Sequence, residues 1–333
     1  MAESVSHPVS TEIPAPSLSV APGPHLASGS FTTRRMMRDV LLASLPLVAV
    51  SLAMFRERAA FQIVVAIVAA MAAETLFGAM RRRPLSLGDL SAVVTGLLLA
   101  LSVPPAAPWY VAAVGAFAGI GFGKAVFGGL GQNIFNPAMV GRAFVMIAFP
   151  AAFGAAAYIA PAVGADAVTQ ATPLAAFKLN GEVTPLGPLF LGLVSGSVGE
   201  TSALAALIGG LYLCGRGTAA WRIPASAIAA MALLAGVPAI WSPAPWTAAH
   251  HLCAGAFLFG AFFIATDPVT SPLTPRGQWI FGAGYAVLVW LIRVLSSYPE
   301  GVMFSVLLMN AVTPLINRWT VPVPVGGPVP ERN

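Results

Sequence analysis

The sequence predicts an all-α polytopic membrane protein with about ten transmembrane helices. Of its 333 residues, 57% are apolar and only 9% are charged, whereas ordinary soluble domains have roughly 25% charged residues. The mean hydropathy is +0.82, and the apolar residues form runs long enough for a bilayer core of about 30 Å. This composition excludes a soluble globular enzyme. It also excludes a disordered chain, which needs low hydrophobicity and high charge.

Flexible tails are expected on both sides of a transmembrane domain that covers residues 34–320. Residues 1–33 are rich in Ser, Pro, Ala and Gly, and they lack the apolar run of a secretory signal. Residues 321–333 are rich in Pro and Gly. We expect both tails to be cytoplasmic.

Ten apolar segments are the predicted spans. The sixth is long and contains Gly196, Ser197 and Gly199, so we expect a helix that is broken near its centre. The ten segments are about 39–55, 60–80, 89–104, 108–127, 138–157, 187–214, 222–241, 248–266, 277–294 and 301–318.

The basic residues predict the direction of these spans. If the N-terminus is cytoplasmic and all ten segments cross, thirteen Lys and Arg fall inside and four fall outside, which is the expected positive-inside bias. The four outside are Arg56, Arg58, Lys178 and Arg293. The polar connection 158–186 then faces the periplasm of a bacterial inner membrane. The net charge of +5 does not predict a nucleic-acid surface, because the basic residues are not concentrated on one face.

The two halves of the chain show a weak internal duplication. The segment that begins at Asp89 resembles the segment that begins at Glu200, and Asn136-Pro137 matches Asp267-Pro268. Repeats of this kind are common in transporters, where broken helices meet near a pseudo-symmetry axis. The alternative is chance similarity between helices rich in Ala, Gly and Leu. A real repeat predicts that the matched polar residues face one shared interior.

Three acidic residues are candidates for an ion pathway, because an ionisable group inside a span usually faces the bundle interior. They are Glu74, Asp89 and Glu200. Asp89 has an alternative interpretation as a helix N-cap. Lys124 lies close enough to a predicted helix end for its amine to reach the membrane interface.

Other patterns do not predict ligand chemistry. The glycine-rich run 119–124 lacks the spacing of a P-loop and the Ser or Thr after its Lys, so we interpret it as close helix packing through small residues. Cys214 and Cys253 form no CxxC pair, and we expect no metal or cluster site from this chain alone. The adjacent His250 and His251 cannot both face one ion from a helix, and we interpret them as interfacial.

Five segments, in this order, carry a resemblance to a known family. They are Gly128–Ala138, Asp166–Leu174, Gly199–Ser202, Phe259–Pro268 and the stretch 292–310 with Tyr298-Pro-Glu-Gly301. From about residue 34 to residue 320, the chain resembles the RnfD/NqrB family. This family contains the D component of the Rnf ion-translocating electron-transport complex (RnfD) and the B component of the sodium-pumping NADH:quinone reductase.

The resemblance implies a covalent FMN, joined through its phosphate to a threonine hydroxyl within a motif that a dedicated flavin transferase reads. The family motif has an Asp, a Ser or Thr three residues later, and a final Ala-Thr. Asp166, Thr169, Ala171 and Thr172 match these places. Gln170 departs from the small residue that is common there, which bears on the efficiency of transfer rather than on which Thr accepts.

Thr172 is therefore the predicted attachment site for FMN. A phosphoester needs a hydroxyl nucleophile, which Thr172 supplies. The proline that follows it biases Thr172 to an extended backbone, where a hydroxyl is more accessible than on a helix.

The resemblance further implies a second, non-covalent flavin, riboflavin, and we name Asn136, Glu200 and Asp267 as candidate contacts. It implies electron flow between ferredoxin and NAD, coupled to sodium or proton movement. The partners would be other flavin, iron–sulfur and membrane subunits. The sequence has no NAD fingerprint and no cysteine cluster, so the chain is not a complete oxidoreductase alone. Two alternatives stay open: a transporter or channel for a small solute or ion without a redox role, and a structural membrane subunit without a cofactor.

Overall fold

A computed structural model of the chain describes residues 32–82, 87–154, 157–159, 170–241, 246–296, 298 and 300–322. Asp166 and Thr169, and nearly all of both predicted tails, lie outside these residues. Within the described ranges the chain forms helices and no β-strand, which confirms the all-α class.

The helices fall into α-helices, short 3-10 helices (η1, η3) and π-helices (η2, η5). In chain order they are α1 (Thr33–Met80), η1 (Leu87–Asp89), α2 (Ser91–Leu101), α3 (Trp109–Ile120), η2 (Gly121–Ala125), α4 (Pro137–Ala148), η3 (Pro150–Phe153), α5 (Pro173–Asn180), α6 (Leu186–Leu191), α7 (Ala203–Gly215), α8 (Arg222–Trp241), α9 (Ala248–Cys253), α10 (Phe257–Phe259), η5 (Gly260–Ile264), α11 (Pro275–Leu295) and α12 (Val302–Thr320).

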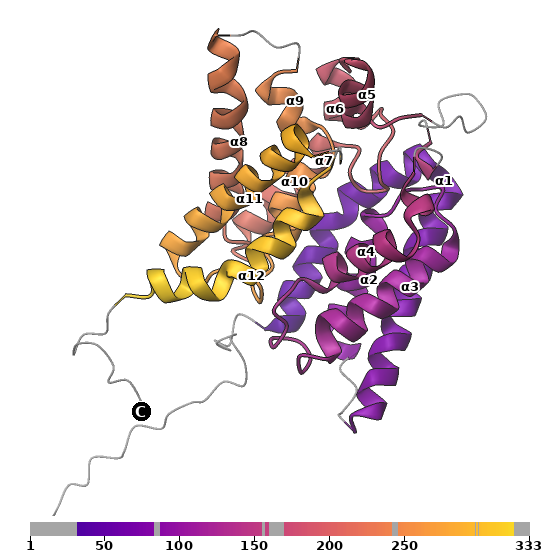
Figure 1. Cartoon of the computed structure of the whole chain (residues 1–333). Helices are drawn as coiled ribbons and strands as arrows, with labels where there is room; N and C mark the ends of the chain where they lie inside the picture. The colour runs from indigo at the N-terminus through magenta and orange to yellow at the C-terminus, as the bar shows by residue number, and fades with distance from the viewer. Residues whose placement is uncertain are drawn as a thin grey trace, which may run out of the picture.

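Two of the described helices, α1 and α11, are long and apolar enough by themselves to cross a membrane. Helix α1 bends sharply at Arg56, where φ is 50° and ψ is −128°. Figure 1 shows its first half rising and its second half descending from this bend. The halves correspond to the predicted spans 39–55 and 60–80. The total of ten spans stays a prediction.

Several predicted spans are broken into shorter pieces. The expected break in the sixth span is confirmed, because α6 ends at Leu191 and α7 begins only at Ala203. The predicted span 248–266 is not one helix: α9, α10 and η5 cover it, and Gly255 has a φ of +67° between the first two. Glycine adopts a positive φ more readily than a residue with a side chain does. Gly255 therefore allows the chain to turn between α9 and α10.

Three helices begin with the same local device, a polar side chain followed by proline. Asn136, Thr172 and Thr274 are the N-caps of α4, α5 and α11, and each side chain accepts a hydrogen bond from a backbone N–H of the first turn. Proline at the first helical position costs no hydrogen bond, because that N–H has no partner within the helix. These starts follow from local sequence alone.

Glycines bring α3 and α4 into close contact. A Cβ added to Gly119 would lie 2.6 Å from the Pro137 carbonyl oxygen, and one added to Gly141 would overlap the Gly115 carbonyl oxygen. These contacts confirm the packing interpretation of the run 119–124.

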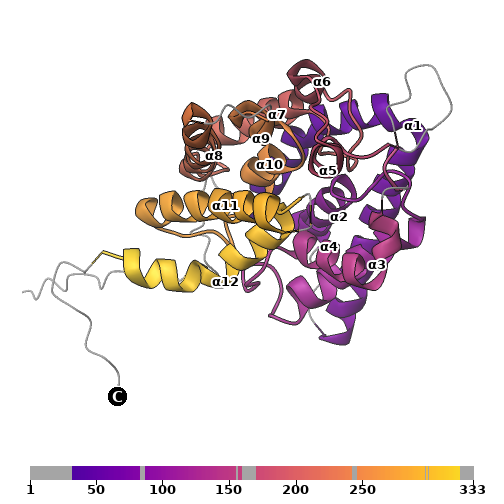
Figure 2. The same cartoon turned by 45° about the horizontal axis from the view of Figure 1, so that its top comes forward.

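The helices form two bundles. Helices α1–α4 pack on one another, as do α8, α11 and α12 with their neighbours, while α1 contacts α7 and α4 contacts α12 between the bundles. Figures 1 and 2 both show the two groups side by side. In Figure 1, α5 and α6 lie at the same end as the bend in α1, and the start of α1 and the end of α12 lie toward the other end.

Candidate functional site

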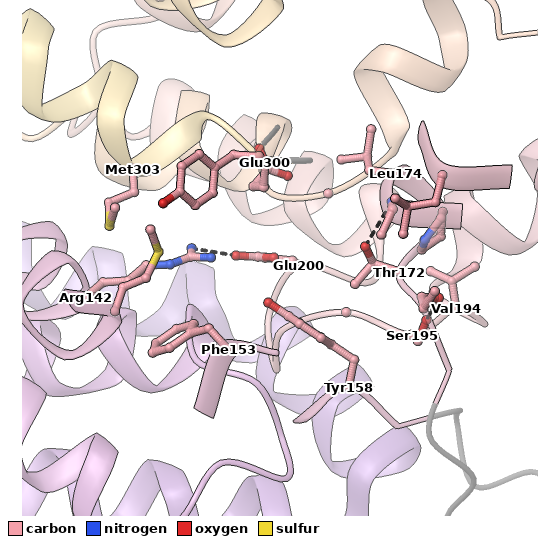
Figure 3. A pocket seen from close by; sticks show the side chains of 18 of the residues that line it. Arg142, Phe153, Tyr158, Thr172, Leu174, Val194, Ser195, Glu200, Glu300 and Met303 are labelled. Atoms are coloured by element: carbon pink, nitrogen blue, oxygen red, sulfur yellow. Dashed lines mark hydrogen bonds and ion pairs between the residues drawn. The ribbon is translucent and has the colours of Figure 1, made fainter. Parts of the chain in front are cut away.

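A cavity of about 380 Å³ lies between the two bundles beside the start of α5. Its volume falls within the range of roughly 300–1,000 Å³ that is common for small-molecule sites. Its walls come from α4, from the N-terminus of α5, from the broken segment before α7 and from the start of α12. Figure 3 shows Thr172 on one side, Arg142 on the other, and Glu200 between them in this view.

Thr172 lies at the edge of this cavity with the extended backbone that its following proline predicts, at φ −65° and ψ 152°. Its Oγ1 accepts a hydrogen bond from the Ala175 N–H at 3.3 Å. The Ser195 hydroxyl donates to the Ala171 carbonyl oxygen at 2.7 Å, which fastens the residue before Thr172 to the broken segment. The hydroxyl is therefore held at the cavity edge and is only partly buried.

A buried ion pair lines the same cavity. The Arg142 Nη1 lies 2.7 Å from the Glu200 Oε1, and the side chains are 6% and 7% exposed. Among the described residues, the Arg142 Nε has no hydrogen-bond partner. A buried guanidinium normally uses all its N–H donors. This N–H can therefore donate a hydrogen bond to a ligand in the cavity.

The remaining polar groups of the cavity are neutral or already bound. Burial, followed by the nearby Glu200 carboxylate, raises the pKa of Tyr158 to about 12, so its phenol is neutral near pH 7. Figure 3 shows the Tyr158 hydroxyl pointing toward the cavity. Glu300 accepts from the backbone N–H groups of Ala256 at 3.0 Å and Gly301 at 3.1 Å, and the Arg293 Nη2 lies 3.4 Å from it.

The arrangement fits a flavin. A flavin needs an apolar slot for its flat ring system, polar groups that satisfy the ring edge, and in this case a hydroxyl for its phosphate. Met146, Phe153, Leu174, Met303 and Phe304 supply apolar walls. The Tyr158 hydroxyl and the unpartnered Arg142 Nε supply donors, and Thr172 supplies the hydroxyl.

Two of the sequence-predicted contacts meet elsewhere, between the bundles. The Asn136 Nδ2 donates to the Asp267 Oδ2 at 3.2 Å, and the Asn136 N–H donates to the Asn310 Oδ1 at 3.1 Å. Asn136 and Asp267, one matched pair of the predicted duplication, face one interior, whereas Asp89 and Glu200, the other matched pair, lie in different places. Glu200 does not join them. A cavity of about 60 Å³ lies beside this pair, which is smaller than the usual small-molecule site.

Comparison with known proteins decides the family. Residues 19–326 match the sequence profile of the NQR2, RnfD, RnfE family. The chain belongs to this family.

Curated members of the NQR2, RnfD, RnfE family resemble the chain over nearly its whole length. The D component of the Na⁺-translocating ferredoxin:NAD⁺ oxidoreductase complex of Acetobacterium woodii is 41% identical over 310 residues, covering 91% of this chain and 93% of that protein. The D component of the proton-translocating ferredoxin:NAD⁺ oxidoreductase complex of Clostridium ljungdahlii is 40% identical and covers 92% and 96%. The D component of the ion-translocating oxidoreductase complex of Halorhodospira halophila is 41% identical and covers 90% and 93%.

Glu74 and Asp89 belong to one hydrogen-bond network, in which both carboxylates are partly buried. The Lys124 Nζ donates to both Glu74 carboxylate oxygens at 2.8 Å and to the Ser91 hydroxyl at 2.7 Å. The Ser91 hydroxyl donates to the Asp89 Oδ1 at 2.6 Å. The expectation that Lys124 reaches the interface is wrong: it is 2% exposed, because Glu74 and Ser91 bind its amine inside the bundle.

Asp89 also takes part in the start of α2. Its Oδ1 accepts from the Ser91 N–H at 2.7 Å, which is the kind of contact that the N-cap interpretation predicts, although the residue directly before α2 is Leu90. Glu200 lies in the cavity beside Thr172 instead. The structure thus separates the three ion-pathway candidates into two places.

Sequence reasoning did not predict that three basic residues are buried. They are Lys124, Arg142 and Arg293. Arg142, assigned to the cytoplasmic side, shares the cavity of Thr172, and Arg293, assigned to the outside, is buried and bound to Glu300. Buried charges do not report orientation. Removing Arg142, Lys124 and Arg293 from the count leaves eleven inside (13 − 2) and three outside (4 − 1), so the bias persists. Glu300, seven residues after Arg293, was an available signal, whereas Glu200 is 58 residues from Arg142 and gave none.

The histidine pair packs against Trp246, and its interfacial interpretation stays a prediction. His250 is 6% exposed, and its ring lies 5.0 Å from that of Trp246. Within the described part of the chain, no group of three His, Cys, Asp or Glu residues is placed to hold a metal ion.

Proposed function

We propose that this chain is the membrane flavoprotein component RnfD of an Rnf-type complex and relays electrons through FMN bound covalently to Thr172. The observation that carries the proposal is the placement of the Thr172 hydroxyl at the edge of a cavity of about 380 Å³. The family membership and the match of Asp166, Thr169, Ala171 and Thr172 to the flavin-transferase motif support it.

Attachment requires one phosphoester bond. A flavin transferase supplies an activated phosphoanhydride of FMN. The Thr172 oxygen bonds to phosphorus, the anhydride bond breaks, and the hydroxyl proton leaves with the departing phosphate or to solvent. When bound, FMN accepts or donates one or two electrons, while the protein supplies position and electrostatics. The Arg142, Tyr158 and apolar side chains of the cavity would hold the ring.

The proposed complex moves electrons between ferredoxin and NAD and couples them to sodium or proton movement. The names of the Acetobacterium and Clostridium relatives specify sodium and protons respectively, so the family by itself does not select the ion. This chain requires flavin, iron–sulfur and membrane subunits as partners. We place it in the bacterial inner membrane, with both termini cytoplasmic and Thr172 periplasmic.

We also propose riboflavin as a second, non-covalent flavin. Asn136 and Asp267 offer a donor and acceptors between the bundles, yet the cavity beside them is only about 60 Å³. Binding there requires the bundles to separate. Extraction of non-covalent flavin from the purified, denatured chain tests this, and its absence would contradict a second flavin.

An ion pathway through this chain is proposed at Glu74 and Asp89, with Glu200 as a separate third acid. The Glu74–Lys124–Ser91–Asp89 network is a chain of buried and partly buried polar groups, and such groups in membranes mark ion paths. Glu74→Gln together with Asp89→Asn should reduce coupled transport in vesicles. Unchanged transport after neutralisation of all three acids would rule out conduction through these groups.

Covalent flavin is tested by fluorescence in a denaturing gel after production of the chain together with its flavin transferase. The parent band should fluoresce, and Thr172→Val should abolish the fluorescence because no hydroxyl remains. Thr184→Val is the matched control, because Thr184 also precedes Pro and Leu in the same connection but lies outside the motif. It should fluoresce like the parent.

Fluorescence that persists in Thr172→Val and disappears in Thr184→Val would move the attachment site. A parent without fluorescence, with transferase activity shown on a second substrate, would contradict the flavoprotein proposal. It would favour a transporter without redox role, for which the broken helices that meet between the bundles are the supporting feature. Solute-flux assays would then be the next measurement.

A further inference from the structure

The cavity beside Thr172 contains one charged pair whose polar capacity is not exhausted. With backbone and side chain taken together, Arg142 is 5% exposed and Glu200 is 9% exposed. Within the described part of the chain, the Arg142 Nη1 lies 2.7 Å from the Glu200 Oε1, and the Arg142 Nε has no partner. Arg142 lies on α4 and Glu200 lies in the broken segment before α7, so two separate elements deliver the two charges.

Among the described residues that line the cavity, the other polar groups include the Tyr158 phenol and the Glu300 carboxylate. Tyr158 is neutral, with its pKa raised to about 12 by burial and by Glu200. Glu300 is neutralised by Arg293 and by three backbone N–H groups, those of Ala256, Gly301 and Val302. Of these two ion pairs, Arg142–Glu200 is the one that lines the cavity with both its charges, because Arg293 does not line it.

Reduction of a flavin by one electron adds one negative charge to its ring unless a proton follows. No bond forms or breaks in this step; the donor, a reduced one-electron carrier, loses the electron that the flavin gains. In a buried site, where charges are poorly screened, a cation near the ring favours the added electron and an anion opposes it. A buried charge therefore shifts the redox equilibrium of the flavin more than a solvent-exposed charge, which is screened by salt, does.

We propose that the Arg142–Glu200 pair sets the reduction potential of the flavin in this cavity. Arg142 stabilises the added negative charge and raises the potential, and Glu200 restrains this effect as the counter-ion of the guanidinium. Both side chains line the cavity that Thr172 borders (Figure 3). The inference rests on the proposed function, because it requires the flavin at Thr172.

The charge logic predicts shifts of opposite sign from two neutral substitutions. Glu200→Gln leaves the cation without its counter-ion and should raise the midpoint potential. Arg142→Gln leaves an unpaired acid and should lower it. Each substitution should change the equilibrium constant of one-electron reduction at least tenfold, which corresponds to a shift of about 59 mV in the midpoint potential. The double variant should lie between the two, because it removes both charges.

The measurement is a spectroscopic redox titration of the purified chain, with covalent loading first shown by gel fluorescence. Arg142→Lys keeps the positive charge, so its potential should stay closer to that of the parent than the potential of Arg142→Gln does. Arg81→Gln removes an exposed charge that does not line this cavity, and it should leave the potential unchanged. These controls separate charge from a general disturbance of the fold.

Loaded variants whose potentials do not move, or that both move in one direction, would overturn the inference while the proposed function stands. If Arg142→Gln is not recovered as folded protein, Glu200→Gln decides: a potential equal to or below that of the parent contradicts the inference. Absence of covalent flavin from the parent would overturn the proposed function and the inference with it.

Discussion

Lys178 joins the helix that begins after Thr172 to the second bundle. Its ammonium donates to the carbonyl oxygens of Arg293 at 2.9 Å and Tyr298 at 3.1 Å, and also to that of Ser296. Two of these carbonyls belong to the C-terminal turn of α11 and the residue after it, where backbone acceptors lack partners within the helix. The Lys178 ammonium therefore caps the C-terminus of α11 and holds α5 beside the cavity. Burial lowers the pKa of Lys178.

Substitution of Lys178 by Met should lower the free energy of unfolding by about 1–3 kcal/mol, because three carbonyl oxygens, two of them in part-buried hydrogen bonds, lose their charged donor. Chemical denaturation in detergent measures this. Glu182→Gln changes an exposed charge in the same connection and should have little effect. Equal stability of Lys178→Met and the parent would show that the carbonyls find water or other donors without cost.

At the scale of elements, proximity between helices depends on glycine. Helices α3 and α4 approach so closely that the Gly141 Cα faces the Gly115 carbonyl oxygen, and Gly119 faces Pro137. Because α4 carries Arg142, this contact also sets the depth of the guanidinium in the bundle. The element that delivers the cation to the cavity is thus positioned by residues without side chains.

Gly141→Ala should destabilise the protein by about 1–3 kcal/mol or more, because the new methyl group meets rigid backbone rather than a movable side chain. Thermal unfolding in detergent and the yield of folded protein measure the loss. Gly78→Ala is the matched control: it also lies in a helix, but its added Cβ would meet nothing within 4 Å. A slight gain in stability is expected there, since alanine favours helix more than glycine does.

At the scale of the whole molecule, the two ends of the bundles are predicted to face opposite sides of the membrane. The short helices α5 and α6 and the bend in α1 lie at one end, and Figure 1 shows the end of α1 near Met80 toward the other. The positive-inside bias predicts that the first end is periplasmic and the second cytoplasmic.

Labelling of single cysteines in intact cells tests this orientation. In a background in which Cys214 and Cys253 are replaced by Ala, Glu182→Cys should react with a membrane-impermeant maleimide from outside. Arg82→Cys should react only after the membrane is permeabilised. Both positions are exposed, so a failure of reaction reports the side of the membrane rather than burial. The reverse pattern would invert the proposed topology.

Features that depend on neighbouring residues could be predicted from the sequence. The all-α class follows from composition, and the break in the sixth span follows from Gly196, Ser197 and Gly199. The extended backbone at Thr172 follows from the proline after it. The family and its flavin motif are likewise patterns along the chain. Each is local, because short-range sterics and hydrogen bonding act over a few residues.

Only the tertiary structure decided which charges meet. Arg142 and Glu200 are 58 residues apart, and Lys124 and Glu74 are 50 apart. No pattern within one apolar segment states which face of another segment will lie against it. In a bundle, that choice depends on the packing of all helices together, through small residues such as Gly141 and through the need to neutralise buried charge. The sequence thus determined the fold class and the residue that we propose carries the flavin, and helix packing determined the charged cavity beside it.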